Sequence, residues 1–311
     1  MYDIVALGEV LIDFTCEGRD GKGYPLLQAH PGGAPANFLA AAAVMGCKTA
    51  LIGKVGDDSF GRLLVKTLRE LKIETGAVKI TDEAFTTMAF VTLDDNGDRE
   101  FSFARKPGAD STLEAADIPE DLIADTKLVH FGSLLMTSET GYNATMRAAE
   151  LAKKHNKLVS YDPNYRAALW DNGEKAVEMM LKGAAQADII KISEEEAELL
   201  FGTKRESAQR FMAENYNFRL SVLTLGADGA ILRSGPNEVF VRAPKVNAVD
   251  TTGAGDICGG SVAAGLLGLP GLDLDRFRRG ERYLTAEELE LIGRDAVTRA
   301  SQSTERHGGM V

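Results

Sequence analysis

Short apolar runs alternate with longer amphipathic segments through the second half of the chain. Four runs rich in Val, Ile and Leu end in Gly, Ser, Asp or Pro, a pattern typical of strands that are buried on both faces. They span 127–133, 157–163, 187–193 and 219–226, with helical patterns over 142–155, 173–185 and 194–201 between them. Strands separated by helices indicate a doubly wound α/β fold with a mostly parallel sheet flanked by helices.

Two stretches interrupt this alternation with strand-like patterns that have no helix between them. Residues 10–30 and 85–105 alternate polar and apolar positions, and the second stretch contains the turn sequence Asp-Asn-Gly-Asp at 95–98. That combination predicts a β-hairpin. We expect both stretches to form a small β-sheet lid over the ligand site, inserted into a single α/β domain that covers residues 1–311.

The two ends of the chain carry signals of their own. The opening sequence MYDIVALGEVLIDFT predicts one strand that ends near Asp13. Near the other end, Thr285 and Glu288 have the spacing of a capping box, which predicts a final helix over 284–299.

Composition narrows the class of protein. The chain has 311 residues, 44% of them hydrophobic and 26% charged, which is typical of a globular protein. Its net charge of -11 argues against binding to nucleic acid or to an anionic membrane, since both require clustered Lys and Arg. No apolar segment reaches the roughly 18 to 20 residues of a membrane span. The three widely spaced cysteines indicate no disulfide framework, so we expect a cytoplasmic protein.

Residues 250–260, DTTGAGDICGG, form the motif with the clearest chemistry. Gly253, Ala254 and Gly255 lie where a loop would pass into a helix, so their amides would face outward at the positive end of the helix dipole. Such donors can stabilise the charge of a phosphoryl group in transfer, and Asp256 could accept the proton of an attacking hydroxyl. The same residues also fit a tight turn followed by a helix-capping aspartate.

Two common phosphate-binding loops are missing from the sequence. The chain contains neither GxxxxGKS nor GxxxxGKT, which excludes a P-loop, and no GxGxxG follows the first strand. The second absence argues against an oxidoreductase that binds a nicotinamide cofactor on a doubly wound sheet.

The segment PGGAPAN at 31–37 suits a polyhydroxylated ligand. Gly32 and Gly33 let the backbone approach a ligand closely, and the Asn37 amide offers both donors and an acceptor. The carboxylate of Asp13 could accept two hydroxyl hydrogens. Taken alone, Asn37 also fits a helix N-cap and Asp13 a turn residue.

These motifs together resemble the ribokinase/PfkB family of carbohydrate and nucleoside kinases, and within it the bacterial fructokinases most. The similarity runs from GEVLIDF through GGAPAN, GKVGDDSFG and YDPNYR to DTTGAGD, and so covers nearly the whole chain. It implies an ATP-dependent kinase that transfers the γ-phosphate to a sugar hydroxymethyl group, with D-fructose converted to fructose 6-phosphate. A 2-keto-3-deoxygluconate kinase or another sugar kinase of the family is the nearest alternative, and a non-catalytic sugar-binding protein is a more distant one.

The resemblance implies a role for each matching residue. Asp256 matches the catalytic base, and the three residues before it match the anion hole. The positions expected to contact the sugar are Asp13, Gly32, Gly33, Asn37, Phe101, Phe103, Arg105, Asn164 and Arg166. The last two of these would lie near the transferred phosphate, where Arg166 would supply a positive charge.

The nucleotide and metal positions follow in the same way. ATP would contact Ser193, Thr224, Gly226 and Gly229. Glu196 would act through water on Mg²⁺, although Glu194 and Glu195 beside it leave the identity of that carboxylate open. Asp250 and Thr252 match the start of a loop that binds K⁺ in the family, with further carbonyl ligands expected near 303–308. The resemblance also implies a homodimer formed through the lid strands.

Overall fold

The computed structural model describes residues 1–93 and 99–310, with the backbone alone for 92, 93 and 99–101. Its larger sheet has 10 strands in the order β14-β13-β12-β11-β10-β9-β1-β4-β5, with β6 also paired to β4. Every pair from β5 to β12 is parallel, and β13 and β14 join antiparallel. The strands are β1 (Tyr2–Leu7), β4 (Thr49–Gly56), β5 (Ile73–Glu74), β6 (Val78–Thr81), β9 (Thr126–Gly132), β10 (Leu158–Asp162), β11 (Ile189–Ser193), β12 (Leu220–Thr224), β13 (Gly229–Ser234) and β14 (Asn237–Arg242).

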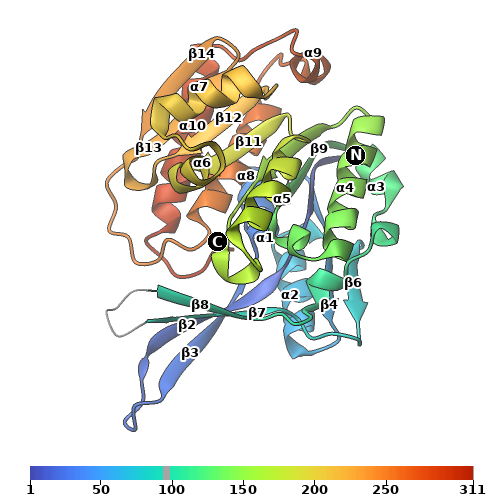
Figure 1. The fold of residues 1–311 in the computed structure, drawn as a ribbon, viewed down its shortest axis with the longest axis vertical. Helices are drawn as coiled ribbons and strands as arrows, with labels where there is room; N and C mark the ends of the chain where they lie inside the picture. The colour runs from blue at the N-terminus through green and yellow to red at the C-terminus, as the bar shows by residue number, and fades with distance from the viewer. Residues whose placement is uncertain (94–98, 311) are drawn as a thin grey trace.

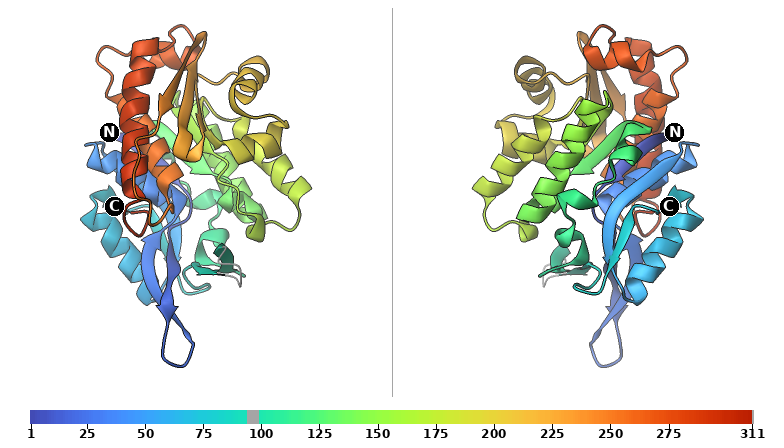
Figure 2. Two further views of the ribbon diagram at one scale, coloured as in Figure 1. Left: turned by 90° about the vertical axis from the view of Figure 1, so that its left-hand side faces the viewer. Right: turned by 90° about the vertical axis from the view of Figure 1, so that its right-hand side faces the viewer.

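Helices cover both faces of this sheet (Figures 1 and 2). Successive strand residues point to opposite faces, so Ile4 and Ala6 of β1 enter one core while Val5 and Leu7 enter the other. The first face packs against α1 (Ala34–Val44), α2 (Ser59–Glu70), α8 (Ala254–Leu267), α9 (Leu274–Arg279) and α10 (Ala286–Ser303). The second packs against α3 (Glu120–Ala124), α4 (Glu139–Lys154), α5 (Gly173–Ala184), α6 (Glu194–Phe201) and α7 (Arg205–Asn215). Short 3₁₀ helices occupy η1 (Ala109–Thr112), η2 (Ala115–Asp117), η3 (Leu134–Thr137), η4 (Ala167–Leu169) and η5 (Gly226–Asp228).

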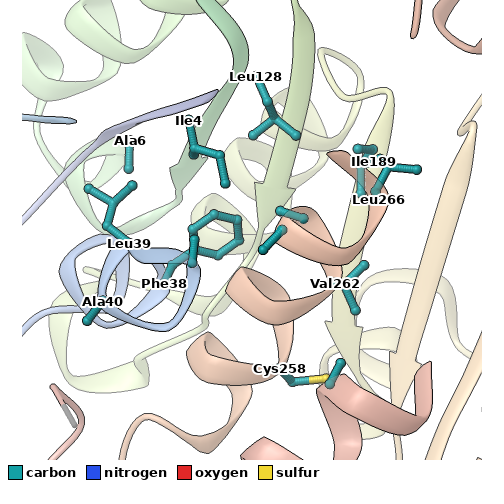
Figure 3. Close-up of a cluster of buried hydrophobic side chains, with 14 of the residues drawn as sticks. Ile4, Ala6, Phe38, Leu39, Ala40, Leu128, Ile189, Cys258, Val262 and Leu266 are labelled. Atoms are coloured by element: carbon teal, nitrogen blue, oxygen red, sulfur yellow. The ribbon is translucent and has the colours of Figure 1, made fainter. Parts of the chain in front are cut away.

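Helices α1 and α8 pack closely because both are rich in small residues. A Cβ atom added to Gly260 would lie 2.2 Å from the backbone oxygen of Phe38, so only glycine allows this approach. The ring of Phe38 lies among side chains of the strands and of α8 (Figure 3). The close crossing brings the N-terminal parts of the two helices together, and the candidate site lies there.

A second sheet of four strands lies beside the larger one (Figure 1). Its order is β3-β2-β7-β8, and its strands are β2 (Leu11–Arg19), β3 (Pro25–Gly32), β7 (Met88–Leu93) and β8 (Arg99–Ala104). The predicted small sheet, separate from the larger one, is therefore confirmed. The turn predicted at 95–98 lies outside the described residues.

The predicted elements of the second half of the chain are confirmed with small shifts at their ends. The final helix begins after Thr285, whose hydroxyl accepts from the Glu288 amide while the Glu288 carboxylate accepts from the Thr285 amide. The prediction of one N-terminal strand is wrong. The chain leaves the larger sheet after Leu7 and enters the smaller sheet at Leu11, and apolar residues continue through both strands without marking the change.

Among residues 1–93 and 99–310, none of the helices has the length and apolar character required to cross a membrane.

Candidate active site

The candidate site lies where the carboxyl ends of the parallel strands meet the start of α8. Asp162 is the last residue of β10, Ser193 ends β11, and Thr224 ends β12 as the direct neighbour of Ser193. Ligands of open α/β sheets bind at this edge. The residues predicted from separate motifs therefore come from elements that end on one side of the sheet.

Asp256 and Asn37 form the centre of the site. Asp256 is the third residue of α8 and is 7% exposed. The Asn37 side-chain amide donates to Asp256 Oδ2 at 2.9 Å, across a chain separation of 219 residues, and the Asn164 amide lies 3.4 Å from Asp256 Oδ1. The N-cap of α8 is Gly253 with φ 77°, so Asp256 does not cap the helix. A buried carboxylate held by two amides is suited to accept a proton from a ligand.

One of the backbone amides at the start of α8 already has a hydrogen-bond partner, whereas the sequence predicts that all of them face a ligand. The Ala254 amide donates to the Thr251 carbonyl at 3.3 Å, which closes the turn before the helix. Gly255 is the second helical residue, and a Cβ atom there would lie 2.7 Å from Lys191 Nζ. A buried lysine therefore lies directly against the first turn of α8.

Sequence reasoning missed Lys191. It lies in β11, is 8% exposed, and donates to Asp162 Oδ2 at 2.9 Å. A charged residue in the interior of an otherwise apolar strand was the signal that could have identified it, because lysine is almost never fully buried without a partner.

Burial controls the charge state of the site. It raises the pKa of Asp256, and the charge of Lys191, the hydrogen bond from Asn37 and the charge of Arg166 oppose that rise. It also raises the pKa of Asp162 to about 7, against the nearby ammonium of Lys191. Burial alone would lower the pKa of Lys191, but the charges of Asp162, Glu196 and Asp256 outweigh it and raise that pKa.

Asp13 lies within β2 of the small sheet, neither at the end of the first strand nor in a turn as predicted. Its carboxylate lies over Gly32, where a Cβ atom would be 2.0 Å from Asp13 Oδ2. Burial raises the pKa of Asp13 to about 7, with Arg166 lowering it and Asp256 and Asp250 raising it further. The charges of Asp256 in α8 and of Arg166 after β10 thus act on this carboxylate.

The loop before α1 completes this side of the site. Gly33 is the N-cap of α1 with φ 111°, and a Cβ atom there would lie 2.6 Å from the Glu9 carbonyl oxygen. Asn37 lies one turn into the helix, so the alternative that it is an N-cap is wrong. Its Oδ1 is buried with no hydrogen-bond partner among residues 1–93 and 99–310, which leaves an acceptor for a ligand hydroxyl.

The lid residues predicted to approach the sugar are placed differently from one another. Phe103 lies in β8 in the same cross-strand row as Ala89 and Asp13, so its side chain is on the face of the sheet that carries Asp13. Phe101 belongs to β8, but its side chain lies outside the described residues.

Arg105 does not join the group around Asp256. Its guanidinium forms an ion pair with Asp110 at 2.7 Å and donates to Thr137 Oγ1 at 2.7 Å and to the Leu134 carbonyl at 3.3 Å. Only 6% of its side chain is exposed. These contacts connect the end of β8 to η1 and η3, so Arg105 anchors the lid. Its positive charge is paired with Asp110.

The segment after β10 brings two further predicted residues to the site. Asn164 has φ 45°, and its backbone N–H donates to Asp162 Oδ1 at 3.1 Å. Arg166 is exposed and donates to the Tyr165 carbonyl, while its charge acts on both Asp13 and Asp256. It lies at the rim of the site.

The start of α6 separates the three neighbouring glutamates. Ser193 and Glu196 form a capping box, and Glu196 also accepts from the Tyr165 amide at 2.7 Å. Glu194 pairs with Arg205 at 3.1 Å, and Glu195 is exposed. Glu196 is therefore the carboxylate of this group that is buried next to Lys191 and Asp162.

The loop after β12 carries the other predicted nucleotide residues. Gly226 has φ 55° with no atom within 4 Å of an added Cβ, and Gly229 has φ 122° with the Val241 carbonyl 2.0 Å from that position. Gly226 therefore leaves open space, whereas Gly229 permits close packing on β14. Thr224 lies beside them at the end of β12.

The loop before α8 contacts the end of the chain. Asp250 is buried and accepts from the Thr252 amide at 2.9 Å and from the Gly308 amide at 3.1 Å. The Thr304 carbonyl accepts from the amides of Val249 and Asp250. The segment 303–308, where further ligands are predicted, thus lies against Asp250.

Within the described ranges 1–93 and 99–310, no three His, Cys, Asp or Glu side chains form a group able to hold a metal ion. This arrangement still fits Mg²⁺, which is held mostly by phosphates and water with one or two carboxylates. Glu196 fits that role because each of its oxygens keeps a further acceptor position beyond its amide hydrogen bond.

Comparison with known proteins gives consistent results. The family model described as "pfkB family carbohydrate kinase" matches residues 1–311. Fructokinase-1 of Oryza sativa subsp. japonica is 41% identical over 256 residues, which cover 81% of this chain and 79% of the relative. Among solved structures, fructokinase with bound ATP from Xylella fastidiosa superposes with a TM-score of 0.88 at 26% identity, covering 100% of this chain and 94% of that one. A fructokinase double mutant from Vibrio cholerae O395, in its form with fructose, ADP and potassium ion bound, gives 0.85 at 28% identity and covers 100% and 94%.

Proposed function

The chain belongs to the pfkB family of carbohydrate kinases, and we propose that this ATP-dependent sugar kinase phosphorylates D-fructose at O6. The observation that carries the proposal is the buried Asp256 at the start of α8, held by Asn37 beneath a four-stranded lid. The named substrate is supported by the fructokinase relatives and by the acidic, amide-lined site.

In the proposed reaction the O6 hydroxyl attacks the γ-phosphorus of ATP. Asp256 accepts the hydroxyl proton as the new oxygen–phosphorus bond forms, and ADP leaves with the electrons of the broken bond. The amides at the start of α8 and the helix dipole stabilise the negative charge on the phosphoryl oxygens. When bound with the phosphates, Mg²⁺ would neutralise part of that charge, and Glu196 is the side chain that would hold it through water.

A neutral sugar suits this site better than a sugar acid. Asp13 and Asp256 present two carboxylates to the ligand, and Arg105 is already paired with Asp110. The carboxylate of a sugar acid would be repelled by Asp13 and Asp256. It would also find no partner in Arg105, whose guanidinium is paired with Asp110. Both effects argue against 2-keto-3-deoxygluconate. The site also keeps the base and the helix start that a non-catalytic sugar-binding protein would not need.

An ADP-release assay tests the proposal. We expect turnover with ATP and fructose, and much lower kcat/KM with ribose, 2-keto-3-deoxygluconate and adenosine. A higher kcat/KM with 2-keto-3-deoxygluconate would assign the chain to that substrate, and saturable sugar binding with no ADP formation from any substrate would support the non-catalytic alternative.

Asp13→Ala is expected to raise KM for fructose about 30-fold with little change in KM for ATP. The reason is the loss of hydrogen bonds to a charged acceptor, worth about 2 kcal/mol. The matched control is Glu17→Gln, an exposed position of the same strand, which should leave both constants unchanged. An unchanged KM for fructose in the Asp13 variant would remove this residue from the sugar site.

The rate is expected to fall on the acid side of neutral pH. Burial raises the pKa of Asp13 to about 7 and raises that of Asp256 as well, and both must be ionised to accept hydroxyl hydrogens. Because a raised carboxyl pKa leaves the group protonated as the pH falls, kcat/KM for fructose should decrease below about pH 7, about tenfold per pH unit while one of the two groups titrates and about a hundredfold per unit once both are protonated. Steady-state rates between about pH 5 and pH 9 measure this, and a flat profile would contradict it.

We further propose a K⁺ site formed by the loop at Asp250 and Thr252 with the chain end beside it. The contacts from Thr304 and Gly308 to this loop support it, as does the potassium ion in the Vibrio cholerae structure. Replacing K⁺ by a larger organic cation in the assay should lower kcat.

We also propose a homodimer that forms through the small sheet. Strands β3 and β8 are its edges, and the hairpin of β2 and β3 projects from the body of the molecule (Figure 2). Leu26 on β3 is 52% exposed, and pairing of edge strands would cover it. Light scattering measures the mass of the protein in solution and so tests for the dimer.

The reducing cytoplasm is the proposed compartment, in keeping with the free thiols of Cys16, Cys47 and Cys258.

A further inference from the structure

Lys191 has no part in the function proposed above, yet its position is chemically unusual. It is a lysine 8% exposed in the interior strand β11, and its ammonium lies against the first turn of α8. The start of a helix carries positive partial charge, which disfavours a cation. Burial of an ammonium also costs several kcal/mol unless it is paired. Because both the helix dipole and burial destabilise the ammonium of Lys191, an anion must lie close to it.

Three carboxylates of the site supply negative charge to Lys191. Asp162 accepts from Lys191 Nζ at 2.9 Å, and the charges of Glu196 and Asp256 act on the same ammonium. One cation among these three carboxylates leaves a negative excess in the site. A phosphoryl group that carries its own negative charge must enter this site, and Arg166 at the rim is exposed. Lys191 is therefore the cation placed deep enough to meet it.

The donor geometry supports the same conclusion. An ammonium has three N–H donors. Within residues 1–93 and 99–310, one hydrogen bond from Lys191 Nζ is recorded, to Asp162. Glycine at position 255 leaves the space next to Nζ open, since a Cβ atom there would lie 2.7 Å away. The remaining donors thus lie next to the helix start that receives the phosphoryl group.

We propose that Lys191 is a further catalytic residue, whose ammonium donates to the oxygens of the phosphoryl group during its transfer while Asp162 holds it in place. The inference rests on the proposed function. Negative charge that develops on the phosphoryl oxygens is stabilised by a cation already fixed in position. Asp162 is a positioning residue, because it acts through Lys191.

Lys191→Met tests the proposal, since methionine keeps the length and removes the charge. We expect kcat to fall about 100-fold, with the Kd for fructose measured by calorimetry within about twofold of the wild type. Lys182→Met, at an exposed lysine of α5, is the matched control and should keep wild-type kcat. A purely structural lysine would instead lower the thermal unfolding midpoint and weaken fructose binding, with kcat per folded molecule unchanged.

The outcomes separate this inference from the proposed function. If the wild type turns over fructose and folded Lys191→Met keeps kcat within about threefold, the inference is wrong and the function stands. If the wild type turns over neither fructose nor the other substrates, the proposed function fails first. If Lys191→Met does not fold, the double variant Lys191→Met with Asp162→Asn removes both buried charges together. The same loss of kcat is then expected, and its absence would overturn the proposal.

Discussion

Asp256→Asn is expected to lower kcat at least about a thousandfold while fructose and ATP still bind, because an amide cannot take the hydroxyl proton at neutral pH. The substitution keeps the shape of the site. Its amide oxygen can still accept from Asn37, which donates to Asp256 Oδ2 at 2.9 Å in the native protein. The change therefore removes the base with little disturbance of its surroundings.

The measurement for Asp256→Asn combines turnover with direct binding of fructose by calorimetry. Asp275→Asn is the matched control, because Asp275 lies in the first turn of α9 but is exposed. It should behave as the wild type. A kcat within about tenfold of the wild type in the Asp256 variant would remove this carboxylate from the chemistry, since a general base contributes about 10²- to 10⁴-fold.

The elements that the sequence predicts well are those whose signals are local. The apolar runs that became β9 to β12 are bounded by residues that favour turns, and the helix starts at Ser193 and Thr285 both show capping boxes in the structure. Capping depends on residues three positions apart, so it can be predicted without knowledge of the fold. The motif at 250–256 could be placed on the start of a helix because its glycines precede a run of small residues, although α8 has no side-chain cap.

The features that the sequence could not predict depend on partners far away in the chain. Arg105 donates to Thr137 and to the Leu134 carbonyl, 32 and 29 residues away, and these contacts hold a cation that the lid motif alone would direct to the sugar. The hydrogen bond from Lys191 to Asp162 joins the interior of β11 to the end of β10, across 29 residues of the chain. Side-chain direction is fixed by such contacts, and a local pattern contains no information about them.

The connections between the lid and the larger sheet show the same dependence on distant partners. Glu9 follows β1 and accepts from the Ala34 amide after β3, so one carboxylate joins two of the lid connections. Asp58 accepts from the Thr86 amide before β7, at 2.8 Å, and Thr87 donates to Asp110. Burial raises the pKa of Glu9 to about 8. The lid is thus held at its connections by buried polar groups, which fixes where Asp13 lies relative to Asp256.

Gly260→Ala is expected to lower the free energy of unfolding by about 3 kcal/mol, although alanine is the better helix former. Helix propensity alone would favour alanine by about 1 kcal/mol. The added Cβ would lie 2.2 Å from the Phe38 carbonyl oxygen, and overpacking against rigid backbone costs about 1–3 kcal/mol or more. The steric clash is therefore expected to outweigh the gain in helix propensity, so that the free energy of unfolding decreases.

Urea unfolding of the two proteins measures the difference, with Gly173→Ala as the matched control. Gly173 begins α5 and has no atom within 4 Å of an added Cβ, so propensity should dominate there and leave stability equal or slightly higher. Because Phe38 adjoins Asn37, separation of α1 from α8 should also weaken the hydrogen bond to Asp256 and lower kcat in the Gly260 variant. Equal or greater stability of that variant would show that the close crossing of the two helices does not hold the catalytic pair together.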